Sequence, residues 1–216
     1  MPYKIAIVSS EKSWINPHIE YLMFLLKQKG HSVQHLFDVK DIPSGDFAFY
    51  LNCWQIADKN ILSRNKHNLV VHPSDLPKGR GWAPLSWQIL EGVNKIPMTL
   101  FEAEEKVDRG PIYLQEFLHF RGDELVDDLR KQQGEMSIWL CLEFVKKYPL
   151  PVQNQIEQKG EASYYPKRSP KDSELDVNKT IAEQFDLLRI VDNDSYPAYF
   201  KFKGQTYILK ISKSRL

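Results

Sequence analysis

Residues 72–84 read His-Pro-Ser-Asp-Leu-Pro-Lys-Gly-Arg-Gly-Trp-Ala-Pro, and a second polar turn, Asp-Arg-Gly, follows at residues 108–110. Each of these segments comes after an apolar stretch typical of a buried strand. Active sites of open α/β sheets form where the strands end. We therefore expect His72 and Asp108 to meet at one end of a sheet, where a carboxylate can orient a proton-carrying imidazole.

Outward from these two turns, apolar segments of strand length alternate with segments of helical periodicity. The predicted strands are residues 4–8, 32–37, 46–51, 68–71, 96–101 and 111–119. The predicted helices are residues 16–29, 58–64 and 82–90. This alternation predicts an α/β fold, with a Rossmann-like and mostly parallel sheet. Because no glycine-rich fingerprint follows the first strand, we expect no dinucleotide site there.

The remainder of the chain predicts a smaller, separate unit. A long helix is expected from Asp123 to about Lys147, with a possible break at Gly134, followed by a linker rich in proline, glutamine and lysine over residues 149–168. We place the main domain at residues 1–150, and the linker with a small C-terminal subdomain at residues 151–216. The subdomain should hold a helix at residues 178–190 and a hairpin of residues 198–202 and 205–211, joined by Lys203-Gly204, whose glycine supplies positive φ.

Composition excludes several classes of protein. The 216 residues carry a net charge of +1, whereas a protein that grips a nucleic-acid backbone shows a basic excess. No apolar run approaches the roughly 20 residues of a membrane-spanning helix, and the chain enters a strand without room for a signal peptide. Cys53 and Cys141 form no disulfide or metal-ligand pattern. We expect a cytoplasmic protein with no membrane or nucleic-acid partner and no metal site.

The pattern His-Pro-Ser-x-Leu-Pro-x-x-Arg-Gly-x-x-Pro, followed by a helix, a strand and Val-Asp-x-Gly, resembles the formyltransferases that use N10-formyltetrahydrofolate. The resemblance covers most of residues 1–120 and continues weakly at residues 164–168 and 196–200. It implies the formyltransferase fold, N10-formyltetrahydrofolate as co-substrate, and transfer of a formyl group to an amine. Such acyl transfer passes through a tetrahedral oxyanion and needs a group that moves a proton.

The resemblance also implies catalytic roles. His72 would stabilise the oxyanion and carry the proton, a contribution of about 3–4 kcal/mol for such a donor, and Asp108 would orient the ring and guide a water. The family triad is Asn-x-His plus Asp, but Val70 stands at the asparagine position here. Asn52, which closes the neighbouring predicted strand, is one candidate for the missing amide. A backbone N–H or a water is the alternative.

Binding residues follow from the same resemblance. The co-substrate pocket is assigned to Trp54, Gln55, Ile56, Glu102, Glu105 and Val107. The acceptor side is assigned to Ser74, Asp75, Lys78, Gly79, Arg80, Tyr164, Tyr165, Lys167 and Arg168. Asp75 stands where many members of the family carry leucine, and its carboxylate suits a positively charged amino sugar. Lys167 and Arg168 would grip a diphosphate beside a base stacked on Tyr164 or Tyr165. Plain core packing, turn chemistry or solvation remain alternatives for these positions.

Among acceptors, the sequence is most similar to the small enzymes that formylate nucleotide-linked amino sugars in pseudaminic-acid-type pathways. The balanced charge, the short segment after the linker, and the Pro-Ser-Asp and Tyr-Tyr-Pro-Lys-Arg patterns favour a UDP-linked 4-amino-4,6-dideoxy sugar. Methionyl-tRNA and glycinamide ribonucleotide remain alternative acceptors. A folate-fold binding protein without transferase activity, or a hydrolase that releases formate, also remains open.

Overall fold

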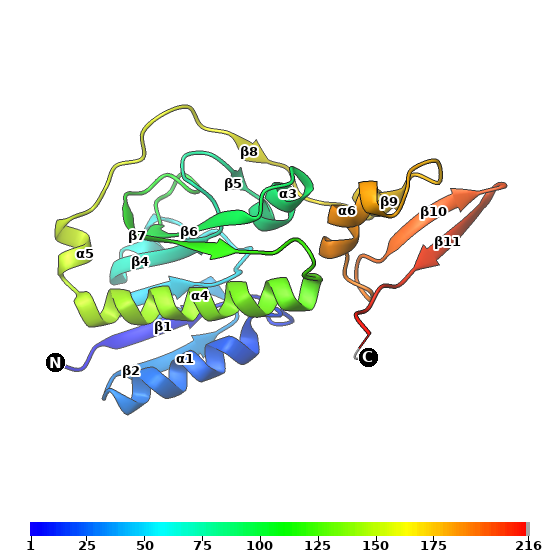
Figure 1. The fold of residues 1–216 in the computed structure, drawn as a ribbon. Helices are drawn as coiled ribbons and strands as arrows, with labels where there is room; N and C mark the ends of the chain where they lie inside the picture. The colour runs from blue at the N-terminus through cyan, green and yellow to red at the C-terminus, as the bar shows by residue number, and fades with distance from the viewer. Residues whose placement is uncertain (215–216) are drawn as a thin grey trace.

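A computed structural model describes residues 1–214 and contains one large sheet with strand order β2-β1-β3-β4-β6-β7 (Figure 1). Its strands are β1 Lys4–Val8, β2 Ser32–Leu36, β3 Gly45–Tyr50, β4 Asn65–His72, β6 Lys95–Glu102 and β7 Ile112–His119. The first four strands pair in parallel, whereas β6 and β7 join the sheet antiparallel. The predicted α/β fold with a mostly parallel sheet is confirmed.

Helices cover the sheet because its strands are apolar on both faces. The α-helices are α1 Asn16–Gln28, α2 Lys59–Leu62, α3 Pro84–Leu90, α4 Val126–Lys147, α5 Leu150–Gln153 and α6 Phe185–Ile190. Helices α1 and α4 lie side by side on one face and pack against Ile5, Phe47 and Phe49 (Figure 1). Ala6 and Tyr50 face the other way, into a second core cluster. No helix within residues 1–214 is long and apolar enough to cross a lipid bilayer.

Helix α4 continues through Gly134, so the break considered at this residue is absent. The His18 ring of α1 packs directly against this position, and a Cβ atom there would lie 2.6 Å from ring atoms. Glycine therefore allows the two helices to approach closely, and the α4 backbone stays regular. The cost of glycine inside a helix, about 1 kcal/mol, is offset by this packing.

The C-terminal part contains a three-stranded sheet of β9 Glu174–Leu175, β10 Ala198–Phe202 and β11 Gln205–Leu209. The predicted hairpin is confirmed, and both Lys203 and Gly204 have positive φ. The predicted helix over residues 178–190 is shorter than expected. Thr180 and Glu183 bond each other reciprocally, as in a capping box, and a 3-10 turn η3 Ala182–Gln184 leads into α6.

The segment expected to be a linker is bonded to the main domain over much of its length. It contains α5, an antiparallel bridge between Ile156 and Ile112, and strand β8 Tyr164–Tyr165, which pairs with β5 Arg80–Gly81. A second 3-10 turn, η2 Pro170–Ser173, follows it, and another, η1 Val39–Asp41, lies after β2. We call residues 154–167 the strap, because they cross the main domain from β7 to β5. The domain boundary at residue 150 stays a prediction.

Candidate active site

A cavity of about 540 Å³ lies between the ends of the central strands, the first half of α4 and the C-terminal part. Its strand-side wall includes Asn52, Trp54, Val70, His72, Trp82, Phe101, Val107 and Asp108. Its opposite wall includes Arg130, Gln133, Ser137, Lys167, Arg168, Ile190, Asp192 and Tyr196. Cavities of this size bind small organic molecules. The two residues expected to meet, His72 and Asp108, both line it.

His72 is the last residue of β4 and is only 8% exposed. Its Nε2 lies 2.9 Å from the carbonyl oxygen of Gly79, and its ring stands edge-on to Phe101. A carbonyl oxygen only accepts hydrogen bonds, so Nε2 carries a proton and donates it to this bond. The ring is therefore fixed by the turn that follows β4, and Nδ1 is the nitrogen that a substrate can use.

Asp108 reaches the cavity by a route that differs from the expected one. Because β6 runs antiparallel to β4, its carboxyl end lies beside Leu69 rather than His72. The loop after β6 then crosses to β5, where Asp108 Oδ2 accepts a hydrogen bond of 2.9 Å from the backbone N–H of Gly81. Asp108 itself has a left-handed backbone, with φ of 57°. The loop, rather than a shared strand end, brings the carboxylate to the site.

The tripeptide Gly79-Arg80-Gly81 links the two candidate catalytic groups. The Gly79 carbonyl accepts from His72, and the Gly81 N–H donates to Asp108. Gly81 has φ of 94°, and a Cβ atom there would lie 2.6 Å from the Tyr165 carbonyl oxygen, so glycine is required. Asp108 was expected to orient the His72 ring directly. In the structure both side chains are instead oriented through this shared backbone.

Asn52 lines the cavity and also has positive φ, 48°. Its Nδ2 donates a hydrogen bond of 2.6 Å to the Ser13 hydroxyl, which fixes the amide. Val70 lines the same wall and offers no donor. Asn68 is buried and bonds the Tyr50 hydroxyl and a backbone carbonyl, as expected for an amide too far back to serve the site.

The proposed co-substrate residues divide into two groups. Trp54, Gln55, Ile56 and Val107 line the cavity. Trp54 is 62% exposed and Ile56 is 69% exposed, so both present apolar surface at the cavity. The side-chain oxygen of Gln55 already accepts a hydrogen bond from the N–H of Val39.

Glu102 and Glu105 lie outside the cavity lining, and Glu104 is the acidic residue of the loop that lines it. The Glu102 carboxylate faces a polar cluster instead, where it accepts from the Asn68 N–H and the Tyr113 hydroxyl and contacts His67. Burial and the Glu102 carboxylate raise the pKa of Tyr113, so this hydroxyl keeps its proton. The expected role of Glu102 is therefore replaced by a structural one.

Most of the proposed acceptor residues also lie outside the lining: Ser74, Asp75, Lys78, Gly79, Arg80, Tyr164 and Tyr165. Ser74 is buried, and the Asp75 carboxylate accepts from Gln115. Arg80 is buried against Gln158 and the Tyr164 hydroxyl. Tyr165 stacks on Trp87 and donates to Glu91, and burial with this bond raises its pKa. These residues build the turns behind the cavity.

Lys167 and Arg168 do line the cavity, and their surroundings differ. The Lys167 ammonium lies 5.7 Å from the Trp54 ring centroid and 5.1 Å from that of Trp82. Arg168 is partly buried, its guanidinium donates to the carbonyls of Ile190 and Asp172, and burial lowers its pKa. Lys167 is therefore placed to meet a ligand, whereas Arg168 mainly holds the C-terminal part together.

Several cavity residues were not predicted. Arg130, Gln133 and Ser137 share one face of α4, and Arg130 forms an ion pair of 2.7 Å with Asp192, which follows α6. The polar spacing i, i+3, i+7 in a helix that is otherwise apolar toward the core is a signal that sequence reasoning could have used. Asp192 and Tyr196 carried no such signal, because only the packing of the C-terminal part brings them to the cavity.

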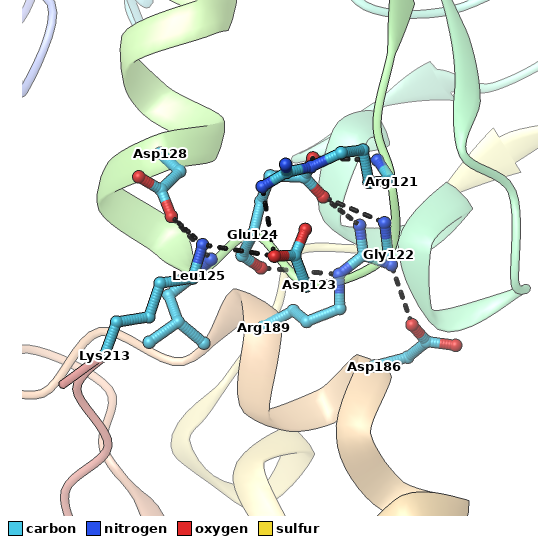
Figure 2. Close-up of polar contacts among 9 residues, drawn as sticks. All are labelled: Arg121, Gly122, Asp123, Glu124, Leu125, Asp128, Asp186, Arg189 and Lys213. Atoms are coloured by element: carbon cyan, nitrogen blue, oxygen red, sulfur yellow. Dashed lines mark hydrogen bonds and ion pairs between the residues drawn. The ribbon is translucent and has the colours of Figure 1, made fainter. Parts of the chain in front are cut away.

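A buried cluster joins the C-terminal part to the start of α4 (Figure 2). The fully buried Arg189 of α6 forms ion pairs with Glu124 and Asp186, and its Nε donates to the Glu124 carbonyl. Glu124 also accepts from the N–H groups of Arg121 and Gly122. We call this group the α4–α6 joint. It sits next to the segment that carries Asp192 into the cavity wall.

The α/β sheet, the cavity at its strand ends, and an imidazole and a carboxylate on its wall are typical of an enzyme that acts on a small molecule. Comparison with known families is more specific. The Formyl transferase family matches residues 6–144, and the chain belongs to it. Members of this family are folate-dependent N-formyltransferases, which take the formyl group from N10-formyltetrahydrofolate.

Individual relatives show how far this likeness extends. The methionyl-tRNA formyltransferase of Thermodesulfovibrio yellowstonii is 28% identical over 145 residues, which cover 67% of this chain and 47% of that protein. The chain spans about half the length of the curated relatives it matches. Among solved structures, methionyl-tRNA formyltransferase from Clostridium thermocellum has a TM-score of 0.82 at 19% identity, covering 98% of this chain and 93% of that one.

A 4-N formyltransferase from Francisella tularensis has a TM-score of 0.68 at 18% identity and covers 99% of both chains. At such identities these two structures establish the fold alone. The expected formyltransferase fold is confirmed.

Proposed function

We propose that this chain transfers the formyl group of N10-formyltetrahydrofolate to the amino group of a nucleotide-linked amino sugar, with a UDP-linked 4-amino-4,6-dideoxy sugar as the specific acceptor. The observation that carries the proposal is that His72 and Asp108 line one cavity whose two walls differ in chemistry. One wall has exposed aromatic and aliphatic side chains, and the other carries Arg130, Lys167 and Asp192.

The residues present fit a folate. Trp54, Ile56 and Val107 are exposed at the cavity and suit the flat apolar faces of a pterin, while the cavity volume of about 540 Å³ suits a molecule of this class. When bound, N10-formyltetrahydrofolate supplies the formyl carbon as an amide of N10. The strand-side wall would hold it with the formyl carbon near His72.

His72 provides the electrostatic part of the reaction. With Nε2 donating to the Gly79 carbonyl, a proton on Nδ1 can be shared with the formyl oxygen as negative charge develops there, and loss of such a donor costs about 3–4 kcal/mol. Asp108, fixed by the Gly81 N–H, guides a water that takes the proton released by the attacking amine and passes it to N10, which leaves as its bond to the formyl carbon breaks. Asn52 offers a second amide donor to the same oxygen, with a backbone N–H or a water as the alternative.

The opposite wall would bind the acceptor. Lys167, held above Trp54 and Trp82, and the Arg130 guanidinium, which is paired with Asp192, are the cationic groups that we assign to a diphosphate, because both line the cavity. Asp192 and Glu104 offer carboxylates for an ammonium-bearing sugar. Sugar N-formyltransferases share this fold, as in the structure from Shewanella sp. FDAARGOS_354, so the fold can accommodate an acceptor of this class.

A methionyl-tRNA acceptor is the second candidate, because methionyl-tRNA formyltransferases are among the relatives, such as the one from Pseudothermotoga lettingae, which is 32% identical over 123 residues. Against it stand the balanced charge of the chain and the small-molecule character of the cavity.

The test is to incubate the protein with N10-formyltetrahydrofolate and to follow tetrahydrofolate release. Parallel reactions would contain UDP- or dTDP-linked 4-amino-4,6-dideoxy sugars, initiator methionyl-tRNA, glycinamide ribonucleotide, or no acceptor. We expect release only with an amino sugar. Release with tRNA or the ribonucleotide alone would overturn the acceptor, release without any acceptor would indicate a hydrolase, and no release at all would indicate a binding protein.

A further inference from the structure

Gln158, in the strap, contacts the backbone on both sides of Arg109. Its Nε2 donates hydrogen bonds of 3.0 Å to the Asp108 carbonyl and 2.9 Å to the Gly110 carbonyl. The strap is brought to this place by the bridge between Ile156 and Ile112, two residues away on each chain segment. One side-chain amide thus clamps the turn that presents the Asp108 carboxylate.

This clamp acts on a backbone that needs support. Asp108 has a left-handed conformation, φ 57°, which residues with a side chain seldom adopt without local hydrogen bonds. Within residues 1–214, its carboxylate is held by one hydrogen bond, from the Gly81 N–H. Holding the carbonyls of Asp108 and Gly110 keeps the turn from relaxing to a conformation in which the carboxylate would leave the cavity.

The other end of the Gln158 amide binds a charged group. Its Oε1 accepts a hydrogen bond of 2.5 Å from Arg80. Arg80 is buried, its remaining contact is the Tyr164 hydroxyl, and its Nε has no hydrogen-bond partner within residues 1–214. A buried guanidinium is ordinarily paired with a carboxylate. A glutamate at position 158 would therefore satisfy Arg80 better, but it would lose both N–H donors to the Asp108 turn.

We propose that Gln158 is a positioning residue for Asp108, and that an amide is needed at this site because it must accept from Arg80 and donate to the turn at once. The proposal rests on the proposed function, since it gives Asp108 a role in the reaction. Gln158 is also linked to both candidate catalytic groups through Arg80. This residue lies between Gly79, which bonds His72, and Gly81, which bonds Asp108. The strap thus fixes the same turn from behind.

The decisive variant is Gln158→Glu, which is nearly isosteric. It keeps the acceptor for Arg80 and adds a charge partner, while removing the two donors to the turn. We expect kcat to fall about tenfold or more, since small misplacements of catalytic groups are costly. Both KM values should change less than about twofold, and the protein should stay folded, because the carboxylate gained by Arg80 offsets part of the two hydrogen bonds that are lost. Gln155→Glu, an exposed glutamine of the same strap, is the matched control.

Two further measurements keep every outcome informative. The concentration of folded sites is first measured by titration with a non-reactive folate analogue, and kcat is calculated per binding site. A lower rate that results only from partly unfolded protein is thereby removed from the comparison. Hydrogen exchange of the Ile112 amide, which bonds the Ile156 carbonyl at the base of the turn, should accelerate in Gln158→Glu and stay unchanged in Gln155→Glu. An unchanged kcat per binding site overturns the positioning role, and unchanged exchange overturns the clamp. A wild-type protein without transfer would overturn the proposed function, while the exchange experiment would still judge the clamp.

Discussion

The two walls of the cavity are held in place by different interactions. On the strand side, His72 and Asp108 bond backbone groups of a single short turn, Gly79-Arg80-Gly81. On the opposite side, the segment that carries Asp192 is held by ion pairs between residues far apart in the chain, Arg189 with Glu124 and Arg130 with Asp192.

Because the two walls are held differently, we expect catalysis and acceptor binding to respond to different substitutions. A hydrogen bond to a backbone group does not depend on which side chain that residue carries, so the catalytic groups are held by the turn itself, which the strap supports from behind. Ion pairs depend on the identity and charge state of both partners. We therefore expect substitutions on the strand side to change turnover, and substitutions in the α4–α6 joint to change acceptor binding and stability.

The largest effect should come from His72→Asn. Asparagine places its amide where Nδ1 stood, so it offers a neutral donor to the cavity but loses the bond to the Gly79 carbonyl, and it can neither carry a proton nor become positively charged. We expect turnover to fall by about 10²–10³-fold, with little change in the binding of the nucleotide sugar. Steady-state kinetics and calorimetric titration with the sugar measure the two quantities. Retention of more than about a tenth of the wild-type rate would show that His72 is not the key donor.

Asn52→Gly should have the next largest effect. Glycine tolerates the positive φ of this residue, so the variant removes the amide without straining the backbone. If the amide stabilises the developing charge, turnover should fall by about 10-fold to 10²-fold. Ser13→Ala, which removes the hydroxyl that fixes this amide, should give a smaller loss in the same direction. An unchanged rate in Asn52→Gly would assign the role to a backbone N–H or a water instead.

Sequence reasoning reached the strand-side wall because its signals are local. The apolar strand before His72, the glycines at positions 79 and 81, and the Asp-x-Gly turn each encode their own conformation. The route of Asp108 was not foreseen, since nothing in residues 96–101 shows that this strand pairs antiparallel to its neighbour. The pairing depends on contacts made across the sheet.

The residues of the opposite wall could not be predicted from the sequence, because they too are brought together by contacts between distant parts of the chain. The ion pair between Arg130 and Asp192 depends on the packing of α6 against the start of α4. No local sequence pattern around Asp192 predicts this contact. The strap was taken for a linker because its glutamines and lysines are typical of solvated chain. Gln158 instead uses its polarity to bond buried backbone and a buried guanidinium.

Arg189→Lys should sharpen the contrast between the walls. Lysine keeps the charge but cannot reach Glu124 and Asp186 together, and hydrogen bonds to charged groups are worth about 1.5–3 kcal/mol each. We expect about 2 kcal/mol of lost stability in urea unfolding and a several-fold rise in the acceptor KM, with the folate KM unchanged. Arg121→Lys, in the same cluster but with a side chain that is 78% exposed, is the control and should change little. Equal rises in both KM values would mean that the joint does not act on one wall alone.

The smallest effect concerns the pH dependence of the same joint. Burial opposes ionisation of Glu124, but the N–H groups of Arg121 and Gly122 and the Arg189 guanidinium outweigh it and hold the pKa of this carboxyl below its usual range. A depressed pKa adds stability that is present above the unfolded-state value and is lost as pH falls through the folded-state value. The stability advantage of the wild type over Glu124→Gln should therefore be full near neutral pH and shrink below about pH 4.5. Urea unfolding at a series of pH values measures it, with Glu135→Gln on the exposed surface of α4 as the control. An advantage that stayed constant down to the acid transition would mean that the ionised Glu124 does not stabilise the joint, and that packing alone holds the second wall.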